Sequence, residues 1–182
     1  MTTPTPLLPI TLTTQPARHT PPPSDTPPAR HRINFTIGTP TSTLPMTQPV
    51  HCEDITLCLP TGIAPTDLLA PQAAPHITAV LPYPGNDVPG YSWTARITRT
   101  PHQTLITFRP EDPRPAITAE HPLILGIQNI PPHPTPGTTT ITITETTTPT
   151  PNTTSTPKQT RITLDKEILT SQQHPTTHQD TP

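Results

Sequence analysis

The chain has 182 residues, 33 of them proline, and only 12% of its residues are charged and 3% aromatic. Its formal net charge of -2 at pH 7 argues against nucleic acid or an anionic membrane as the main partner, because both require clustered Lys and Arg. The six glycines follow no Gly-X-Y period, which excludes a collagen-like helix.

The length allows one domain of ordinary size with tails. Leu, Ile, Val and Phe make up roughly a fifth of the chain, close to the level at which disorder is expected. The net charge is too small for self-repulsion, so we expect a small ordered core with unstructured ends. No apolar run approaches the ~18 residues of a membrane span, so we expect no membrane insertion. The first residues lack the basic and apolar regions of a signal peptide, and the compartment stays open between the cytoplasm and non-classical export.

The first expected strands lie at 7–14 (LLPITLTT) and 33–38 (INFTIG). In both segments apolar residues alternate with polar ones, which is the pattern of a half-buried strand. Pro9 cannot donate to a strand ladder, so it favours an edge position for the first strand. The segment 15–31 contains no periodic apolar residue, and we expect it to be a mobile loop.

A third expected strand, 53–60 (EDITLCLP), places alternate Ile and Leu residues on one face and ends at a Pro-Thr-Gly turn. The segment 63–75 that follows is the one place where the sequence favours a helical turn. Thr66 is a suitable cap for a short helical run through Leu69, and prolines on both sides confine that run to about one turn.

Further strands are expected at 76–80, 92–99 and 104–108. The turn at 100–102 (Thr-Pro-His) predicts that the last two of these strands form a hairpin.

The clearest strand pair in the sequence lies further along, at 123–130 and 138–145. A proline-rich crossing that ends in Pro136-Gly137 separates the two strands, and the second strand alternates Thr with Ile.

These segments give about eight short strands with no helix between them. Parallel sheets require helical crossovers of a dozen or more residues, so we expect two antiparallel sheets packed face to face. A closed barrel is the alternative, but irregular proline-rich connections favour a Greek-key sandwich of about seven to nine strands. The fold class is therefore all-β, with the sandwich domain expected over 1–147.

After this domain we expect a Thr/Pro-rich linker at 148–158, because its composition cannot build a core. The final segment, 159–182, is expected to be mostly disordered. Its part 159–173 contains apolar residues, and three roles stay open for it: an added strand, a short helix from Asp165, or a contact with a partner.

The stretches CEDITLCLPTG (52–62) and TDLL (66–69), the Trp93 strand and LILGIQNIPPHPTPGTTTITITE (123–145) together resemble bacterial immunoglobulin-like β-sandwich modules. The resemblance covers 5–147 and lies in the pattern of strands and turns. It implies an immunoglobulin-like Greek-key fold. It also implies that the module binds, spaces or decorates, although a fold by itself does not fix a function.

The sequence predicts neither a metal site nor a catalytic site. Cys52 and Cys58 are too far apart for a disulfide if they lie on one extended strand, and their spacing does not fit a zinc site. There is no G-x-S-x-G motif, and the adjacent acids Glu53 and Asp54 point to opposite faces of a strand. The histidines are scattered through the sequence, at positions 19, 31, 51, 76, 102, 121, 133, 174 and 178.

The best candidate recognition surface is the segment 82–93 (PYPGNDVPGYSW). It contains Tyr83 and Tyr91, rigid aromatic residues of the kind that binding surfaces favour, and the turn residues Asn86 and Asp87. The alternative is that the tyrosine rings cover the end of the sandwich. Asn34-Phe-Thr and Asn152-Thr-Thr match the N-glycosylation pattern, which arises by chance in a chain so rich in Thr.

We therefore predict a non-catalytic binding or structural module that requires no cofactor and binds a protein or a glycan. It would act through the 82–93 loop, an open sheet edge or the C-terminal tail. The alternatives are a hydrolase or carbohydrate-active enzyme on a β scaffold, and a mucin-like disordered stalk.

Overall fold

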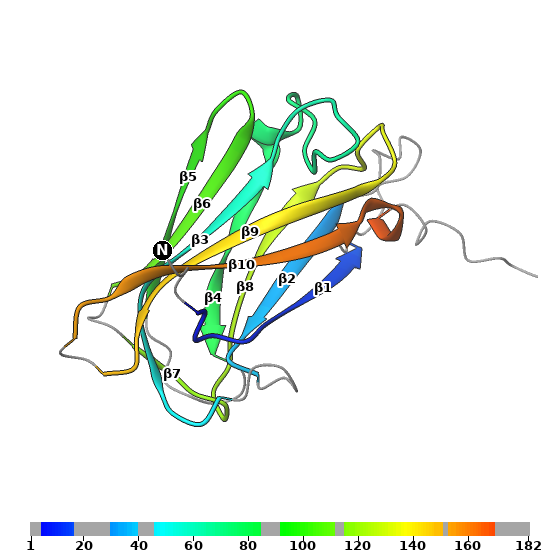
Figure 1. Ribbon diagram of the computed structural model, residues 1–182. Coiled ribbons are helices and arrows are strands. Elements are labelled where there is room, and N and C mark those ends of the chain that lie inside the picture. The colour runs from blue at the N-terminus through cyan, green and yellow to red at the C-terminus, as the bar shows by residue number, and fades with distance from the viewer. Residues whose placement is uncertain are drawn as a thin grey trace, which may run out of the picture.

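The computed structural model describes residues 5–16, 30–39, 46–84, 92–111, 115–150 and 153–169, and it shows ten strands arranged in two antiparallel sheets (Figure 1). The four-stranded sheet has the order β1 (Ile10–Pro16), β2 (His31–Ile37), β8 (Leu123–Ile130), β4 (Thr78–Pro84). The six-stranded sheet has the order β10 (Thr156–Asp165), β9 (Thr138–Thr148), β3 (Val50–Pro60), β6 (Gln103–Pro110), β5 (Trp93–Arg99). Its sixth strand, β7 (Ala116–Ile117), pairs with β3.

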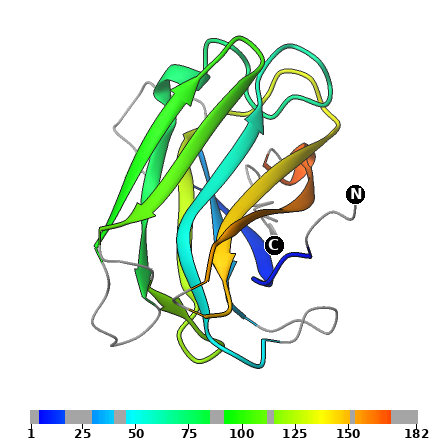
Figure 2. The same ribbon diagram turned by 60° about the vertical axis from the view of Figure 1, so that its left-hand side comes forward.

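The predicted all-β sandwich is confirmed, although it contains one strand more than the largest number expected. The two sheets face each other in both ribbon views (Figures 1 and 2). Two short 3-10 helices, η1 (Ala74–His76) and η2 (Lys166–Leu169), complete the described elements. No helix within the described ranges is both long and apolar enough to cross a bilayer.

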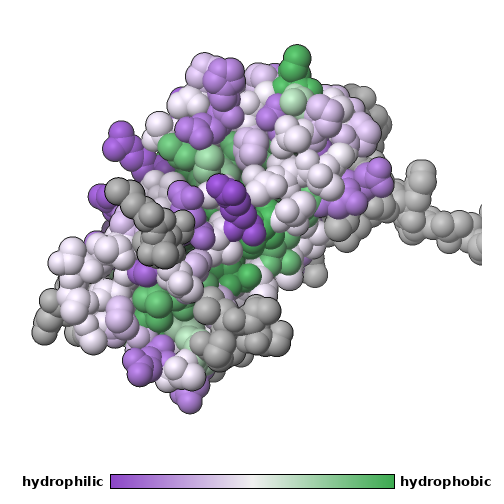
Figure 3. Space-filling model, in the orientation of Figure 1, coloured by the Kyte–Doolittle hydropathy of each residue, from purple (hydrophilic) through white to green (hydrophobic). Residues whose placement is uncertain are grey.

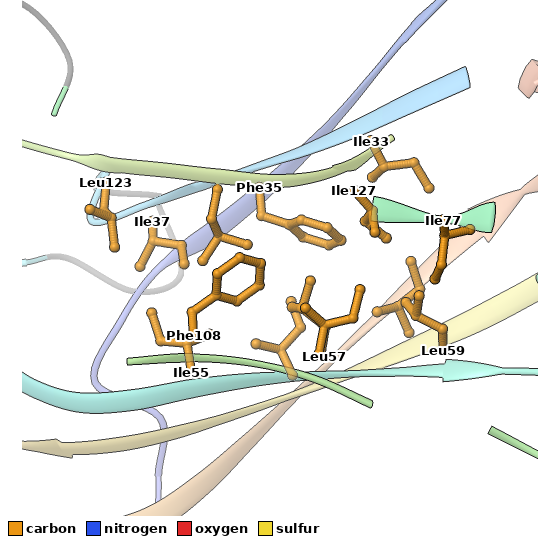
Figure 4. Packing of buried hydrophobic residues seen from close by; sticks show 14 of the residues in the cluster. Ile33, Phe35, Ile37, Ile55, Leu57, Leu59, Ile77, Phe108, Leu123 and Ile127 are labelled. Atoms are coloured by element: carbon orange, nitrogen blue, oxygen red, sulfur yellow. The ribbon is translucent and has the colours of Figure 1, made fainter. Parts of the chain in front are cut away.

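The core lies between the sheets, and much of it consists of apolar residues that alternate with polar ones along the strands. On β2 these are Ile33, Phe35 and Ile37, and all three are fully buried. Ile55, Leu57 and Leu59 of β3 are equally buried. Figure 4 shows side chains from the two sheets meeting in the middle, with Phe35 and Phe108 directed toward each other.

The hairpin predicted at 100–102 is confirmed, because β5 and β6 pair antiparallel and Thr100 N–H donates to the carbonyl of Gln103 at 2.9 Å. The edge position expected from Pro9 is also confirmed, since β1 lies at the edge of the four-stranded sheet.

The strands β8 and β9 do not pair with each other. The first belongs to the four-stranded sheet and the second to the six-stranded sheet, so the proline-rich segment between them carries the chain from one sheet to the other. The crossing ends at Gly137, whose φ of +134° is readily adopted only by glycine.

The helical turn predicted from Thr66 to Leu69 is wrong. The N–H groups of Leu68 and Leu69 both donate to the carbonyl of Pro60, at 3.0 and 3.1 Å, so the segment folds back on the end of β3. The Asp67 carboxylate accepts the N–H of Ala64 at 2.8 Å and closes a turn there. Local capping chemistry therefore produces a turn, and the short helix η1 forms later in the segment.

The C-terminal segment adds a strand to the six-stranded sheet, which is one of the three roles left open for it. Strand β10 begins at Thr156, inside the segment expected to be a linker, and pairs with β9 in a register that places Ile162 opposite Ile141. Leu164 and Leu169 join the core. The loop expected over 15–31 is shorter than predicted, because β1 extends to Pro16 and β2 begins at His31. Its middle part, 17–29, and the final residues 170–182 lie outside the described residues.

The described surface is mainly polar. On the face shown in Figure 3, hydrophobic residues form separate patches between hydrophilic and neutral ones. Among the described residues, the exposed large hydrophobic side chains are Ile63, in the turn after β3, and Leu81 on β4.

Candidate binding site

The predicted recognition segment lies mostly outside the described residues. Tyr83 is on β4, where its backbone pairs with Ile124, but its side chain is not described. Asn86, Asp87 and Tyr91 all lie in the range 85–91, outside the described residues. Their role in binding stays a prediction. The structure does establish that this segment joins β4 to β5, which are edge strands of the two opposing sheets.

A shallow hollow of about 310 Å³ lies on the β5–β6 hairpin, next to the end of that segment. We call it the β5–β6 hollow. Its lining residues are Thr94, Ala95, Arg96, Thr98, Thr107 and Arg109. The pairing of β5 with β6 brings these residues together, since Thr94 lies opposite Arg109 and Arg96 lies opposite Thr107.

The β5–β6 hollow is polar and positively charged. The Arg96 side chain is exposed, and the side chain of Arg109 is 69% exposed. Arg109 Nη2 lies 3.7 Å from Asp54 Oδ2, and Asp54 Oδ1 accepts a hydrogen bond from Thr146 Oγ1 at 2.9 Å. Exposed ion pairs contribute only about 0–1 kcal/mol, so a ligand can compete for Arg109 at little cost. The hollow therefore presents two guanidinium groups and several hydroxyls to solvent.

Sequence reasoning missed this hollow, although part of the signal was present. The expected strand 92–99 contains Arg96, and the hairpin turn at 100–102 pairs it with the expected strand 104–108. Arg109 lies one residue beyond that expected strand, and β6 extends through it. The residues that line the hollow alternate along β5 with Trp93 and Ile97, which lie on the inner face.

A second group of polar residues is buried at one end of the sandwich. His133 Nε2 lies 3.2 Å from the carbonyl oxygen of Gly62, and His133 Nδ1 lies 3.1 Å from the carbonyl oxygen of Thr135. The same Nδ1 lies 3.1 Å from the backbone nitrogen of Thr135 and 3.4 Å from Lys166 Nζ. Lys166 Nζ also donates to the carbonyl of Asp67 at 2.9 Å. Burial lowers the pKa of Lys166, and the negative charge of Asp67 acts in the opposite direction.

This buried group joins three segments: the turn after β3, the β8–β9 crossing and η2. We expect Lys166→Ala to lower the free energy of unfolding by about 1–3 kcal/mol, because it removes the hydrogen bond that the buried Lys166 side chain donates to the partly buried Asp67 carbonyl. Urea unfolding measures the loss. Arg161→Ala is the matched control, because Arg161 is an exposed cation on the adjacent strand β10, and it should change stability by less than about 0.5 kcal/mol. Equal effects of the two substitutions would contradict this role of Lys166.

The cysteines and histidines do not form a reactive site in the part of the chain that the structure describes. Cys52 and Cys58 both lie on β3 and are free, and burial raises the pKa of each thiol. A raised pKa keeps a thiol protonated and poorly nucleophilic. Within the same ranges no three His, Cys, Asp or Glu side chains come close enough to hold a metal ion. Asn34 is buried, with its Oδ1 accepting from Arg32 Nε at 2.6 Å, so this glycosylation pattern is inaccessible in the fold.

No protein-family model matches the chain, and no curated protein matches it either.

Proposed function

We propose that the chain is a non-catalytic binding module and that it contacts its partner through the β5–β6 hollow. The observation that carries the proposal is the pair of exposed guanidinium groups, Arg96 and Arg109, held beside threonine hydroxyls on a paired strand surface. Guanidinium groups form strong, charge-assisted hydrogen bonds with carboxylates. A protein or a glycan that carries carboxylates fits this surface.

The chemistry of the hollow favours binding over catalysis. Arginine stays protonated at any physiological pH, so it cannot act as a general base. Arg109 forms an ion pair with the carboxylate of Asp54, and this carboxylate also accepts a hydrogen bond from the hydroxyl of Thr146. Threonine hydroxyls without an adjacent base are poor nucleophiles. The groups of the hollow therefore supply hydrogen bonds and positive charge and no means of moving a proton.

We also propose that the sandwich is of the immunoglobulin-like type. The antiparallel order of both sheets supports this, as do the connections that pass between them, such as the one from β8 to β9. Strand β3 and the crossing into β9 contain the stretches on which the resemblance depends. Modules of this type serve binding more often than chemistry, which agrees with the polar hollow.

The test begins by screening the intact chain against peptide and glycan arrays. For the ligands that bind, the double variant Arg96→Glu, Arg109→Glu should weaken affinity roughly tenfold or more, which corresponds to about 1.4 kcal/mol. Arg161→Glu is the matched control, since it reverses an exposed charge on β10 at the opposite edge of the same sheet. Thermal unfolding establishes that the variants are folded. Ligands that bind the double variant as well as the control would overturn the proposal.

A further inference from the structure

We propose that the open edge of β5 receives an extended strand of a partner polypeptide, whose residues alternate between acidic and apolar. The inference rests on the proposed function and deepens it, because it names the class of ligand and its mode of binding. It follows from the backbone of β5, from the prolines of the other edge strands and from the side chains on both faces of β5.

No described strand pairs with the side of β5 that faces away from β6. The ladder between β5 and β6 is bounded by a bond from Glu111 N–H to the carbonyl of Ser92, at 2.8 Å, and one from Thr100 N–H to the carbonyl of Gln103, at 2.9 Å. Bonded and non-bonded pairs alternate along antiparallel strands, so only every second residue of β5 bonds to β6. The residues that direct their N–H and C=O groups away from β6 are Trp93, Ala95, Ile97 and Arg99.

The other three edge strands contain proline, which lacks an N–H and removes one bonding position for an added strand. Strand β1 ends at Pro16, β4 includes Pro82 and Pro84, and β10 includes Pro157. In a chain with 33 prolines, β5 has none within its bounds. It lies at the outer edge of its sheet in both ribbon views (Figures 1 and 2). Of the four edges, the edge of β5 is therefore the one best able to pair with another strand.

The side chains of β5 define the pattern of the incoming strand. On the inner face, Ala95 and Ile97 are only partly buried and pack against the core, so apolar side chains of an added strand would cover them. On the facing edge strand of the other sheet, β4, Leu81 is 48% exposed. On the outer face, Arg96 would lie beside acidic side chains, and opposite charges across strands are favourable.

The same charges argue against a second copy of this chain as the occupant. Antiparallel pairing of β5 with β5 would place the Arg96 side chains of both copies on the same outer face of one short ladder. Like charges that face each other across strands are destabilising. An acidic strand removes this repulsion and makes use of the outward arginines, so charge complementarity favours a partner of different sequence.

The test uses an N-acetylated, C-amidated peptide of seven residues that alternates valine and glutamate, which matches the length of β5. Amide hydrogen exchange is followed by NMR on the intact, isotope-labelled chain. The peptide should slow exchange at Ala95, Ile97 and Arg99 by roughly tenfold or more, since these amides gain a partner. The amides of Thr94, Arg96 and Thr98, which the ladder assigns to bonds with β6, should change little.

Two changes test the backbone contacts from opposite sides. Ile97→Pro removes one outward N–H and should weaken peptide binding roughly tenfold. Thr163→Pro is the matched control: Lys166 N–H bonds to Gly137, so the alternation places Thr163 at an outward position of β10, and the substitution should leave binding unchanged. If Ile97→Pro unfolds the chain, the unaltered protein is tested with the same peptide N-methylated at alternate amides, which should not bind.

The outcomes separate this inference from the proposed function. A peptide whose binding depends on Arg96 but which protects none of the outward amides would overturn strand addition and leave the proposed function standing. If acidic peptides do not bind but glycans do, in a manner that depends on Arg96, strand addition is likewise overturned and the proposed function stands. Outward amides that are protected without peptide, more strongly as protein concentration rises, would identify a second copy as the occupant and overturn the inference. Equal binding of valine–lysine and valine–glutamate peptides would overturn the acidic specificity.

Discussion

Replacement of Phe108 by alanine is expected to lower the free energy of unfolding by about 3–5 kcal/mol, the usual cost of truncating a buried aromatic side chain to alanine. Phe108 is 0% exposed and points across the interior toward Phe35 (Figure 4). Its removal leaves a cavity between two sheets whose backbones are fixed by their ladders, so the surroundings cannot collapse to fill it. Urea unfolding at constant pH measures the loss.

Ile63→Ala is the control for this prediction. It also removes apolar atoms, but the Ile63 side chain is 83% exposed, and surface substitutions usually change stability by less than about 0.5 kcal/mol. Because single domains are stable by only about 5–15 kcal/mol, the Phe108 variant should show a clearly lower urea midpoint. A midpoint similar to that of the Ile63 variant would show that the core does not depend on this contact between the sheets.

The period of two in the sequence predicted most of the strands because these strands have one face in the core. Strand β3 illustrates this: Ile55 and Leu57 are fully buried, and Thr56 between them is half-buried. The hairpin of β5 and β6 was also predictable, since the two strands are adjacent in sequence and separated by a proline turn. Local pattern is sufficient wherever partners are close along the chain.

Partnership between distant segments was not predictable. Strand β9 pairs with β3, about ninety residues earlier, and with β10, which begins in a segment whose Thr/Pro composition resembles a linker. Composition describes how a segment behaves alone. In the fold, the segment is held as a strand by its backbone pairing with β9 and by the burial of Leu164 in the core. The hollow combines both cases, because its residues lie on a predictable hairpin while its counter-ion Asp54 comes from β3.

A buried carboxylate on β9 is the clearest feature that no local pattern indicates. Glu145 is 1% exposed, and its Oε1 accepts the N–H of Leu7 at 2.7 Å and the hydroxyl of Thr147 at 3.0 Å. The N–H of Leu8 lies 3.3 Å from Oε1 and 3.2 Å from Oε2. Through these hydrogen bonds Glu145 connects the segment that precedes β1 to β9, which belongs to the opposite sheet.

Glu145→Ala is expected to lower the free energy of unfolding by about 2–4 kcal/mol, because each buried donor left without a partner costs about 1–3 kcal/mol. Glu145→Gln keeps one acceptor oxygen for Leu7 and should cost less. Urea unfolding compares the two, and amide exchange at Leu7 and Leu8 locates the effect, since loss of the acceptor should speed exchange at these two positions. If the amides of Leu7 and Leu8 exchange at the same rate in the alanine variant, Glu145 does not hold this segment in place.

The ionisation of Glu145 should also make stability depend on pH. Burial raises the pKa of Glu145 above its ordinary value of 4.5, and the hydrogen bonds from Leu7, Thr147 and Leu8 and the charge of Lys158 oppose that shift. A raised pKa means that the folded state binds the proton more tightly than the unfolded state. The contribution of Glu145 is therefore most favourable below the unfolded pKa and is lost as pH rises through the folded pKa.

We expect the stability of the natural chain relative to Glu145→Gln to fall as pH is raised from about 4, where free glutamate side chains titrate. The slope can reach about 1.4 kcal/mol per pH unit for one proton, and it should vanish above the folded pKa. Urea unfolding of both proteins across this pH range measures the difference, and glutamine is the suitable reference because it has nearly the same shape and does not titrate. Curves that stay parallel would show that the pKa of Glu145 is the same in the folded and unfolded chain, and that its hydrogen bonds offset its burial completely.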